Sequence, residues 1–251
     1  MHDIEGMIRE NRRVRRDFYR CRIELARPLD KVTPGQFIML KIPSSEIFLR
    51  RPFSIYDYGD ESVTILYKAV GKGTRALASA RPKERVMVLG PLGKGFQLFR
   101  GYTPVLVAGG IGVAGLHLLW KQVSKEGHFF FGCSAEEELA LLGKITIQKS
   151  CLCTIDGSAG FCGNVVQLLE HALPLLGKKP YVYACGPEPM FVGLKELLAE
   201  EKIPCQVLVE ERMACGLGLC FGCVKKTLDK REPYKRACIE GPVFDLWQLS
   251  L

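Results

Sequence analysis

The stretch V-L-V-A-G-G-I-G-V-A-G, residues 105–115, determines the fold class of this 251-residue chain. Four apolar residues form a strand-like run, and Gly110, Gly112 and Gly115 match G-x-G-x-x-G ahead of a helix-like run. Such glycines let a nucleotide diphosphate approach a helix N-terminus, where free N–H groups and the helix dipole favour anions. Glycine-rich turns also pack helices onto sheets without a ligand, so the motif alone leaves both interpretations open.

Around this motif, apolar runs alternate with helix-like stretches, and the alternation predicts a parallel sheet with helices on its faces. The helix after the second strand would open with a capping box from Ser134 to Glu137. We expect strands at 104–108, 128–132, 144–148, 181–184 and 205–209, and helices at 114–125, 135–142, 164–173 and 190–201.

The first hundred residues have a different texture, with short β-rich runs broken by Pro and Gly. These runs, at 36–42, 52–56, 62–70 and 84–89, and one short helix at 74–80 predict a small antiparallel β-barrel. The last forty residues are rich in cysteine and glycine. We therefore expect a barrel domain at 1–101, an α/β domain at 102–210 and a small cysteine-bearing module at 211–251.

Composition limits the class of protein. With 47% apolar and 25% charged residues, the chain is typical of a globular protein and not of a disordered or fibrous one. No apolar run reaches the roughly 20 residues of a membrane span, and the start lacks a secretion signal, so we expect a cytoplasmic protein with no membrane partner. Seven arginines at 9–22 supply much of the net charge of +8, and their apolar neighbours favour a solvated edge strand over a nucleic-acid surface.

Eleven cysteines in a reducing compartment favour metal or redox chemistry. Cys215, Cys220 and Cys223 have the spacing C-x4-C-x2-C, and Cys238 follows on a separate turn. This is the plant-type [2Fe-2S] spacing, in which glycines let the loop curl around the cluster. A structural zinc site usually takes two C-x2-C pairs or Cys/His pairs, so zinc and plain buried thiols are the less favoured alternatives.

Further motifs point to nucleotides. R-R-P-F-S-I at 50–55 and K-A-V-G-K-G-T at 68–74 could together hold a flavin nucleotide, with an arginine for its diphosphate and a helix start for the second phosphate charge. Y-A-C-G-P-E-P-M at 183–190 follows the fourth predicted strand, where such sheets bind ligands. Glu136, Glu137 and Glu138, with no arginine near them in the sequence, favour NAD(H) over NADP(H).

Taken together, these motifs resemble a known family. The chain is similar to the electron-transfer subunits of dihydroorotate dehydrogenase B, within the ferredoxin-NADP reductase superfamily. The resemblance covers essentially the whole chain and is most specific in E-E-R-M-A-C-G-L-G-L-C-F-G-C at 210–223. It also rests on V-G-K-G-T, G-P-L-G-K-G-F, G-G-I-G and C-G-P-E-P-M.

The resemblance implies site residues. The catalytic pair would be Ser54, near the reactive flavin edge, and Cys185, near the nicotinamide; both would orient the cofactors. FAD would be bound by Arg51, Pro52, Phe53, Ser54, Lys68, Ala69 and Val70, and at its diphosphate by Gly71, Lys72, Gly73 and Thr74. The nicotinamide nucleotide would lie against Gly109, Gly110, Ile111, Gly112, Cys185 and Gly186, and the [2Fe-2S] cluster would be held by Cys215, Cys220, Cys223 and Cys238.

The implied activity is that of an NAD(H)-dependent flavin iron–sulfur oxidoreductase subunit in de novo pyrimidine (UMP) biosynthesis. An FMN-containing partner would oxidise dihydroorotate, and electrons would pass through the cluster and FAD to NAD+ in a heterotetramer with two copies of each subunit. FAD is needed because a nicotinamide takes two electrons as hydride while a [2Fe-2S] centre moves one at a time. The alternatives are a similar subunit of a hydrogenase or of a ferredoxin-dependent transhydrogenase and, from another class, a zinc-bearing nucleotide sensor.

Overall fold

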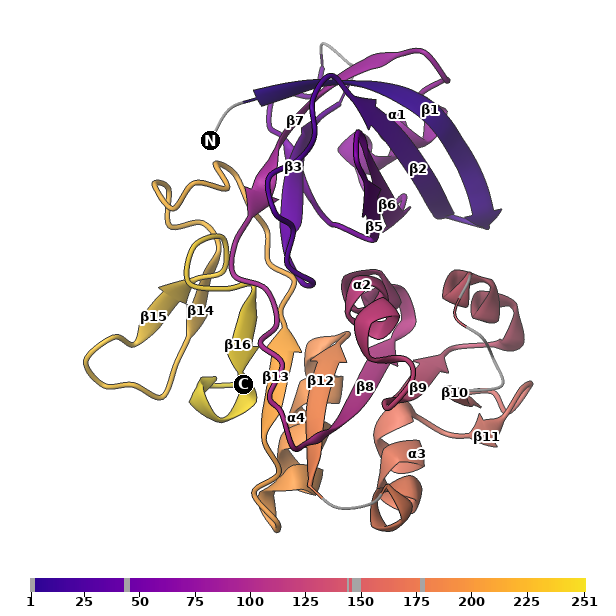
Figure 1. The fold of residues 1–251 in the computed structure, drawn as a ribbon, viewed down its shortest axis with the longest axis vertical. Helices are drawn as coiled ribbons and strands as arrows, with labels where there is room; N and C mark the ends of the chain where they lie inside the picture. Colours follow the sequence, from indigo (N-terminus) through magenta and orange to yellow (C-terminus); the bar gives the residue numbers. More distant parts are fainter. Residues whose placement is uncertain (1–2, 43–45, 144, 146–149, 177–178) are drawn as a thin grey trace.

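The computed structural model describes residues 3–42, 46–143, 145, 150–176 and 179–251, and Figure 1 shows three parts in chain order. An antiparallel sheet (indigo to purple) is followed by a mostly parallel sheet with helices, and the cysteine-rich end (yellow) lies beside both. This arrangement confirms the predicted fold class of a barrel joined to an α/β unit. No helix in the described part of the chain is long and apolar enough to cross a membrane.

Seven antiparallel strands form the first sheet, in the order β4-β3-β7-β1-β2-β6-β5. The sheet curls around a core that includes Ile8, Ile23 and Ile65. The chain just after β4 meets β6 near the other edge of the sheet, where the Tyr56 N–H donates to the Thr64 carbonyl at 3.0 Å. Its elements are β1 (Asp3–Arg15), β2 (Phe18–Leu25), β3 (Phe37–Lys41), β4 (Arg51–Ser54), β5 (Asp57–Gly59), β6 (Ser62–Lys68), α1 (Lys72–Ser79) and β7 (Arg85–Leu92).

The arginine-rich start forms a hairpin of β1 and β2, not the single edge strand expected at 9–22. The turn at Arg16 and Asp17 contains neither glycine nor proline and therefore lacks a turn signal, and Arg16 takes a positive φ of 33°. Beyond Met7, β1 pairs only with β2 within this sheet. That half of the strand is therefore a sheet edge, as the charge pattern indicated, but several of its arginines pair with acidic side chains.

The second sheet has the order β11-β10-β9-β8-β12-β13-β16 and is parallel except for β16. Its central strand β8 runs directly into the glycine turn. The elements are β8 (Thr103–Gly109), η1 (Gly110–Gly112), α2 (Val113–Val123), β9 (His128–Cys133), η2 (Glu136–Leu142), β10 (Ser150–Thr154), β11 (Phe161–Cys162), α3 (Val165–Ala172), η4 (Leu173–Leu175), β12 (Pro180–Cys185), α4 (Glu188–Ala199) and β13 (Cys205–Leu208).

Separate apolar clusters cover the two faces of this sheet. On one face lie α3 and α4, which bury Leu169 and Leu194. On the other lies α2, which packs between the sheet and the barrel, as Figure 1 also shows. The ring of His117 on α2 stacks on Tyr56 of the barrel with centroids 3.9 Å apart, and Lys121 pairs with Asp57 at 2.7 Å. The barrel and the sheet therefore form one continuous body around α2.

Two local predictions in this region differ from the structure. The strand expected at 144–148 lies outside the described residues except for Ile145, which is in a bend, and a strand that was not predicted occurs at 150–154. The capping box predicted from Ser134 to Glu137 is wrong. The segment is the 3-10 helix η2 and begins after Ala135, without a side-chain cap, because Glu137 pairs instead with arginines of the barrel.

The cysteine-rich end forms β14 (Val224–Lys226), β15 (Tyr234–Arg236), β16 (Val243–Asp245) and η5 (Leu246–Gln248). β16 pairs antiparallel with β13 and so extends the second sheet. The Lys94 N–H donates to the Gly241 carbonyl at 2.6 Å, which ties the same segment to the chain leaving the barrel. The module is therefore joined to both preceding parts by backbone hydrogen bonds.

Candidate cofactor and nucleotide sites

The cluster loop at 215–223 is shaped by glycines. Gly216 and Gly218 have φ values of +68° and +78°, a conformation that side chains other than glycine rarely adopt. Two backbone donors point at sulfur: Leu217 N–H lies 3.4 Å from Cys215 Sγ, and Gly222 N–H lies 3.4 Å from Cys220 Sγ. The loop thus has the N–H groups aimed at thiolates that tune an iron–sulfur site.

Among the four predicted ligands, Cys215 interacts with Cys220, and Cys238 interacts mainly with Cys223 and more weakly with Cys215. Burial acts to raise the pKa of Cys215, but hydrogen bonds from the Leu217 and Cys220 backbones more than offset this and lower its pKa to about 6. Burial, reinforced by the neighbouring Cys223, raises the pKa of Cys238 to about 12. Two thiols on each of two irons is the arrangement of a [2Fe-2S] centre, so the donor set fits that group.

A single metal ion is a different case. Across the described ranges, no group of three His, Cys, Asp or Glu side chains is placed to hold one metal ion. A tetrahedral zinc site needs its four ligands to converge on one point, whereas a binuclear cluster needs two pairs. The paired thiols therefore favour the cluster over the zinc alternative.

Sequence reasoning missed Arg236, which lies beside the cluster loop. Its Nη1 donates to the Gly218 carbonyl (2.9 Å), and its guanidinium carbon lies 5.1 Å from the centre of the Phe221 ring. Glu240 pairs with the same guanidinium (Nε to Oε2, 3.1 Å) and holds it in place. A lone arginine thirteen residues after Cys223 carries no spacing signal, so only the fold reveals that it braces the loop.

The two halves of the predicted flavin site come together at the start of α1. A Cβ added at Gly73 would lie 2.7 Å from Arg51 Nε, so the arginine packs directly on the first turn of the helix. Thr74 Oγ1 accepts the Gly71 N–H at 3.1 Å, and Arg51 Nη1 donates to the Leu49 carbonyl at 2.8 Å. A guanidinium beside a helix start is suited to a diphosphate.

Other predicted FAD residues lie around this point. Phe53 is buried and packs edge-on against Tyr67, and Ser54 is half-buried at the end of β4. Lys68 lies at the end of β6 with its amine 5.0 Å from the centre of the Phe18 ring. The remaining residues of this set are Pro52 in β4, Ala69 and Val70 in the β6–α1 connection, and Lys72 as the first residue of α1.

A cleft of about 720 Å³ opens at the carboxyl ends of β8, β9 and β12, against the barrel residues Phe18 and Lys68. This is where open α/β sheets bind ligands. The predicted nicotinamide residues Gly109, Gly110, Ile111, Gly112 and Gly186 line it.

The glycines of the turn have separate tasks. A Cβ on Gly110 would meet nothing within 4 Å, so this residue leaves the cleft floor open. A Cβ on Gly112 would lie 2.0 Å from the Cys185 carbonyl oxygen, so Gly112 allows the turn to lie directly on the end of β12. The packing interpretation of the motif is therefore confirmed at Gly112, and the nucleotide-binding interpretation stays a prediction at Gly110.

Cys185 is fully buried and is not among the residues lining the cleft. A Cβ added at Gly115 would lie 3.1 Å from its Sγ, which places the thiol beneath α2. Burial raises the pKa of this thiol well above its usual value, and the charge of Glu210 adds to the effect. Cys185 is therefore a neutral thiol, and its role beside the nicotinamide stays a prediction.

Charged residues that the sequence did not single out also line the cleft. Glu210 follows β13, and desolvation of its carboxyl group by the surrounding protein raises its pKa. The Lys225 side chain is only 14% exposed and pairs with Glu188 and, at 3.3 Å, with Glu211. Because Lys225 lies two residues after Cys223, it links the cluster loop to the nucleotide cleft.

Comparison with known proteins agrees with this geometry. The family described as "Iron-sulfur cluster binding domain of dihydroorotate dehydrogenase B" matches residues 210–250. The "Dihydroorotate dehydrogenase B (NAD(+)), electron transfer subunit" of Caldanaerobacter subterraneus subsp. tengcongensis is 35% identical over 243 residues, 96% of each chain. The protein of the same name from Lysinibacillus sphaericus is 40% identical over 236 residues, 88% of each chain.

A solved structure shows the same fold. A chain of the NADH-dependent reduced ferredoxin-NADP oxidoreductase, studied for flavin-based electron bifurcation, superposes with a TM-score of 0.84 at 24% identity. The match covers 98% of this chain and 89% of the other.

Fold and relatives together define the class: the chain is an electron-transferring oxidoreductase subunit with an iron–sulfur cluster binding domain, and it has the fold of that solved reductase. Within that class, the identity over nearly the full length of its relatives is decisive. The chain belongs to the family of dihydroorotate dehydrogenase B (NAD(+)) electron transfer subunits.

Proposed function

We propose that this chain carries electrons from an FMN-containing dihydroorotate dehydrogenase partner to NAD+ in pyrimidine biosynthesis. The observation that carries the proposal is the position of β3. A Cβ on Gly216 of the cluster loop would lie 2.7 Å from Met39 Cγ, and Met39 pairs across the sheet with Pro52 of the flavin motif. A single strand thus separates the cluster loop from the predicted FAD residues.

Each part of the chain then has a defined task. When bound, the cluster passes single electrons and FAD combines them into the pair that a hydride needs. Cys215, Cys220, Cys223 and Cys238 would hold the cluster, and Arg51 and the start of α1 would hold the FAD diphosphate. The open floor at Gly110 admits the nicotinamide nucleotide, and the barrel wall at Phe18 and Lys68 closes the opposite side.

The partner would dock on the face around Cys220. That cysteine is exposed, and its neighbours Leu219 and Phe221 have exposed fractions of 78% and 61%. Large apolar side chains left open beside a redox centre are typical of an interaction surface. The FMN-containing subunit is the occupant we propose, in a complex of two copies of each chain.

Organisation and location complete the proposal. The boundary at 101/102 is supported by the two sheets, since the first ends at Leu92 and the second begins at Thr103. We keep the boundary at 210/211 because it follows the end of β13 at Leu208 and precedes the cluster loop. In the last module, β14 and β15 pair with each other as a hairpin, and β16 pairs with β13 of the second sheet. A cytoplasmic location is supported by the need of the four ligands for reduced thiols.

Reconstitution tests the proposed function. The chain is purified anaerobically with and without the partner, and iron, sulfide, FAD and the absorption spectrum are measured. We expect the isolated chain to reduce an artificial dye with NADH, and only the complex to reduce NAD+ with dihydroorotate. If the isolated chain oxidised dihydroorotate, or if its thiols held zinc, the division of roles would be wrong.

The FAD cradle gives a separate prediction. We expect Arg51→Ala to weaken FAD binding by about 10- to 100-fold, because a charge-assisted contact to the diphosphate is lost. Arg51→Lys should recover part of the affinity, since an ammonium keeps the charge without the forked donors. FAD affinity is measured by fluorescence titration of the deflavinated protein. Arg85→Ala, on a barrel arginine that pairs with Glu5, serves as the control; equal losses in both variants would contradict the role of Arg51.

A further inference from the structure

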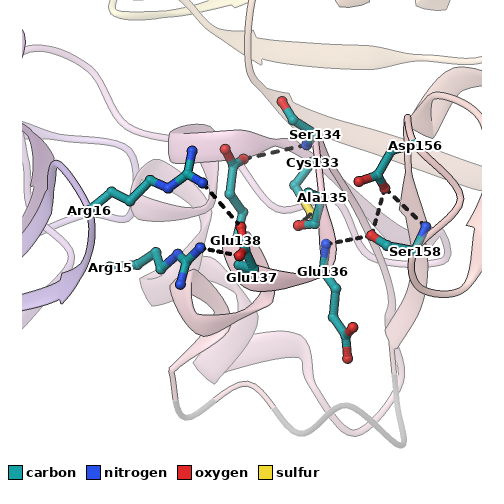
Figure 2. Close-up of polar contacts among 10 residues, drawn as sticks. All are labelled: Arg15, Arg16, Cys133, Ser134, Ala135, Glu136, Glu137, Glu138, Asp156 and Ser158. Carbon is teal, nitrogen blue, oxygen red and sulfur yellow. Dashed lines mark hydrogen bonds and ion pairs between the residues drawn. The ribbon is translucent and has the colours of Figure 1, made fainter.

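Three consecutive glutamates follow β9, and the structure directs them to different partners (Figure 2). Glu138 lines the nucleotide cleft, and its Oε2 accepts the Ser134 N–H at 3.4 Å. Glu137 pairs with Arg15 and, at 3.8 Å, with Arg16 of the barrel. The Glu136 side chain extends away from both arginines in the figure, and its backbone N–H donates to Ser158 Oγ at 2.7 Å.

The place of this segment in the sheet gives it a role in nucleotide recognition. β9 is the strand next to β8. With the diphosphate of a dinucleotide at Gly110, the adenosine ribose would extend toward the carboxyl end of β9. The cleft continues in that direction to Ile155, Asn164 and Gln167, which offer an apolar surface and amide groups for a base. This placement rests on the proposed function, which puts NAD(H) in this cleft.

The guanidiniums of Arg15 and Arg16 are suited to bind a phosphate, but both are paired with the Glu137 carboxylate. Arg15 is half-buried, with a side-chain exposure of 31%, and within the described part of the chain its Nε is buried without a hydrogen-bond partner. Paired guanidiniums bind phosphate strongly through forked, charge-assisted hydrogen bonds. Among the described residues, neither arginine nor Glu137 lines the cleft, but both guanidiniums pair with Glu137, and the next residue, Glu138, does line it. The two guanidiniums therefore lie just outside the cleft wall at Glu138, where we place the 2′ position of the ribose.

We infer that Glu137 and Glu138 together set the preference for NADH over NADPH. Glu138 favours NADH by accepting a hydrogen bond from the free 2′-hydroxyl and by repelling a 2′-phosphate. Glu137 disfavours NADPH by neutralising the two guanidiniums that would otherwise bind that phosphate. Selectivity thus comes from an attractive contact to one ligand and from a binding group withheld from the other.

Glu137→Gln in the holoenzyme tests whether neutralisation of Arg15 and Arg16 by Glu137 disfavours NADPH. We expect the ratio of kcat/KM for NADPH to kcat/KM for NADH, measured with a dye acceptor, to rise about tenfold through a lower KM for NADPH. The gain should shrink as ionic strength rises, because it comes from charge. Adding Arg15→Gln and Arg16→Gln to the same variant should remove the gain, whereas Glu136→Gln alone should leave the ratio unchanged.

Glu138→Gln tests the attractive contact. We expect kcat/KM for NADH to fall about tenfold, because a neutral amide is a weaker acceptor for the ribose hydroxyl. Calorimetric titration with adenosine 2′,5′-bisphosphate and with 5′-AMP gives a readout independent of turnover; Glu137→Gln should gain affinity for the bisphosphate alone. An unchanged NADPH to NADH ratio and unchanged bisphosphate affinity in Glu137→Gln, with full FAD content, would overturn the inference. A wild-type holoenzyme that failed to turn over NADH would instead count against the proposed function.

Discussion

Cys220→Ala is expected to lower dihydroorotate-linked NAD+ reduction by the reconstituted complex at least about a hundredfold, because even the outer partners of metal ligands are worth 10- to 100-fold. NADH-driven dye reduction should remain, since FAD and the nucleotide cleft are untouched. Cys220 is the most suitable of the four ligands to change because it is exposed, so its loss leaves the packed core intact. Alanine is chosen because serine can itself ligate iron.

The matched control is Cys162→Ala, which removes another exposed thiol, on β11, without cluster spacing. It should retain iron, sulfide and both activities. Iron content and the absorption spectrum are measured alongside the two rates. If Cys220→Ala kept the cluster and the dihydroorotate-linked rate, Cys220 would not be a ligand and the plant-type assignment would fail.

Gly112→Ala is expected to destabilise the fold by about 3 kcal/mol or more, at the upper end of overpacking effects. The added methyl group would lie 2.0 Å from the Cys185 carbonyl oxygen and 2.4 Å from its carbonyl carbon. Both are backbone atoms of a central strand, so relief requires α2 to move away from β12 and to open the packed face beneath it. Nucleotide binding should weaken at the same time, because the turn forms the cleft floor.

Gly193→Ala is the control for this prediction. Gly193 lies within α4, and the nearest atom to an added Cβ is 3.4 Å away, in ordinary contact. Because alanine is the better helix former by up to about 1 kcal/mol, this variant should be neutral or slightly more stable. Urea unfolding of both FAD-loaded proteins, followed by circular dichroism, gives the comparison. Equal midpoints for the two variants would show that Gly112 has no packing role.

Most of the fold follows from local patterns. The alternation after Pro104 predicted β8, β9, β12 and β13 with their helices, because buried parallel strands are continuous apolar runs. The failures lie where local signals are weak or compete. The run I-T-I at 145–147 and the run C-L-C at 151–153 have similar strand character, and nothing local marks the second as β10. β16 is three residues long, so no periodicity could identify it.

The candidate sites divide in the same way. Cluster spacing and glycine turns are contiguous in sequence, so the four cysteines and the two nucleotide motifs were predictable. Arg236, Lys225 and Glu210 act through partners distant in the chain, and only the fold brings them to the sites. The capping box expected at Ser134 is also wrong because of a distant partner: Glu137, the glutamate of that box, pairs with Arg15, more than a hundred positions away in the chain.

The strand β16 has a consequence for how electrons travel. Because it is hydrogen-bonded to β13, and because Gly241 beside it accepts the Lys94 N–H, the iron-bearing module cannot swing on a flexible tether. Redox proteins with mobile carrier domains depend on diffusion between docking positions. In this chain the donor and acceptor distances are built into the scaffold, so solvent viscosity should have little influence on internal transfer.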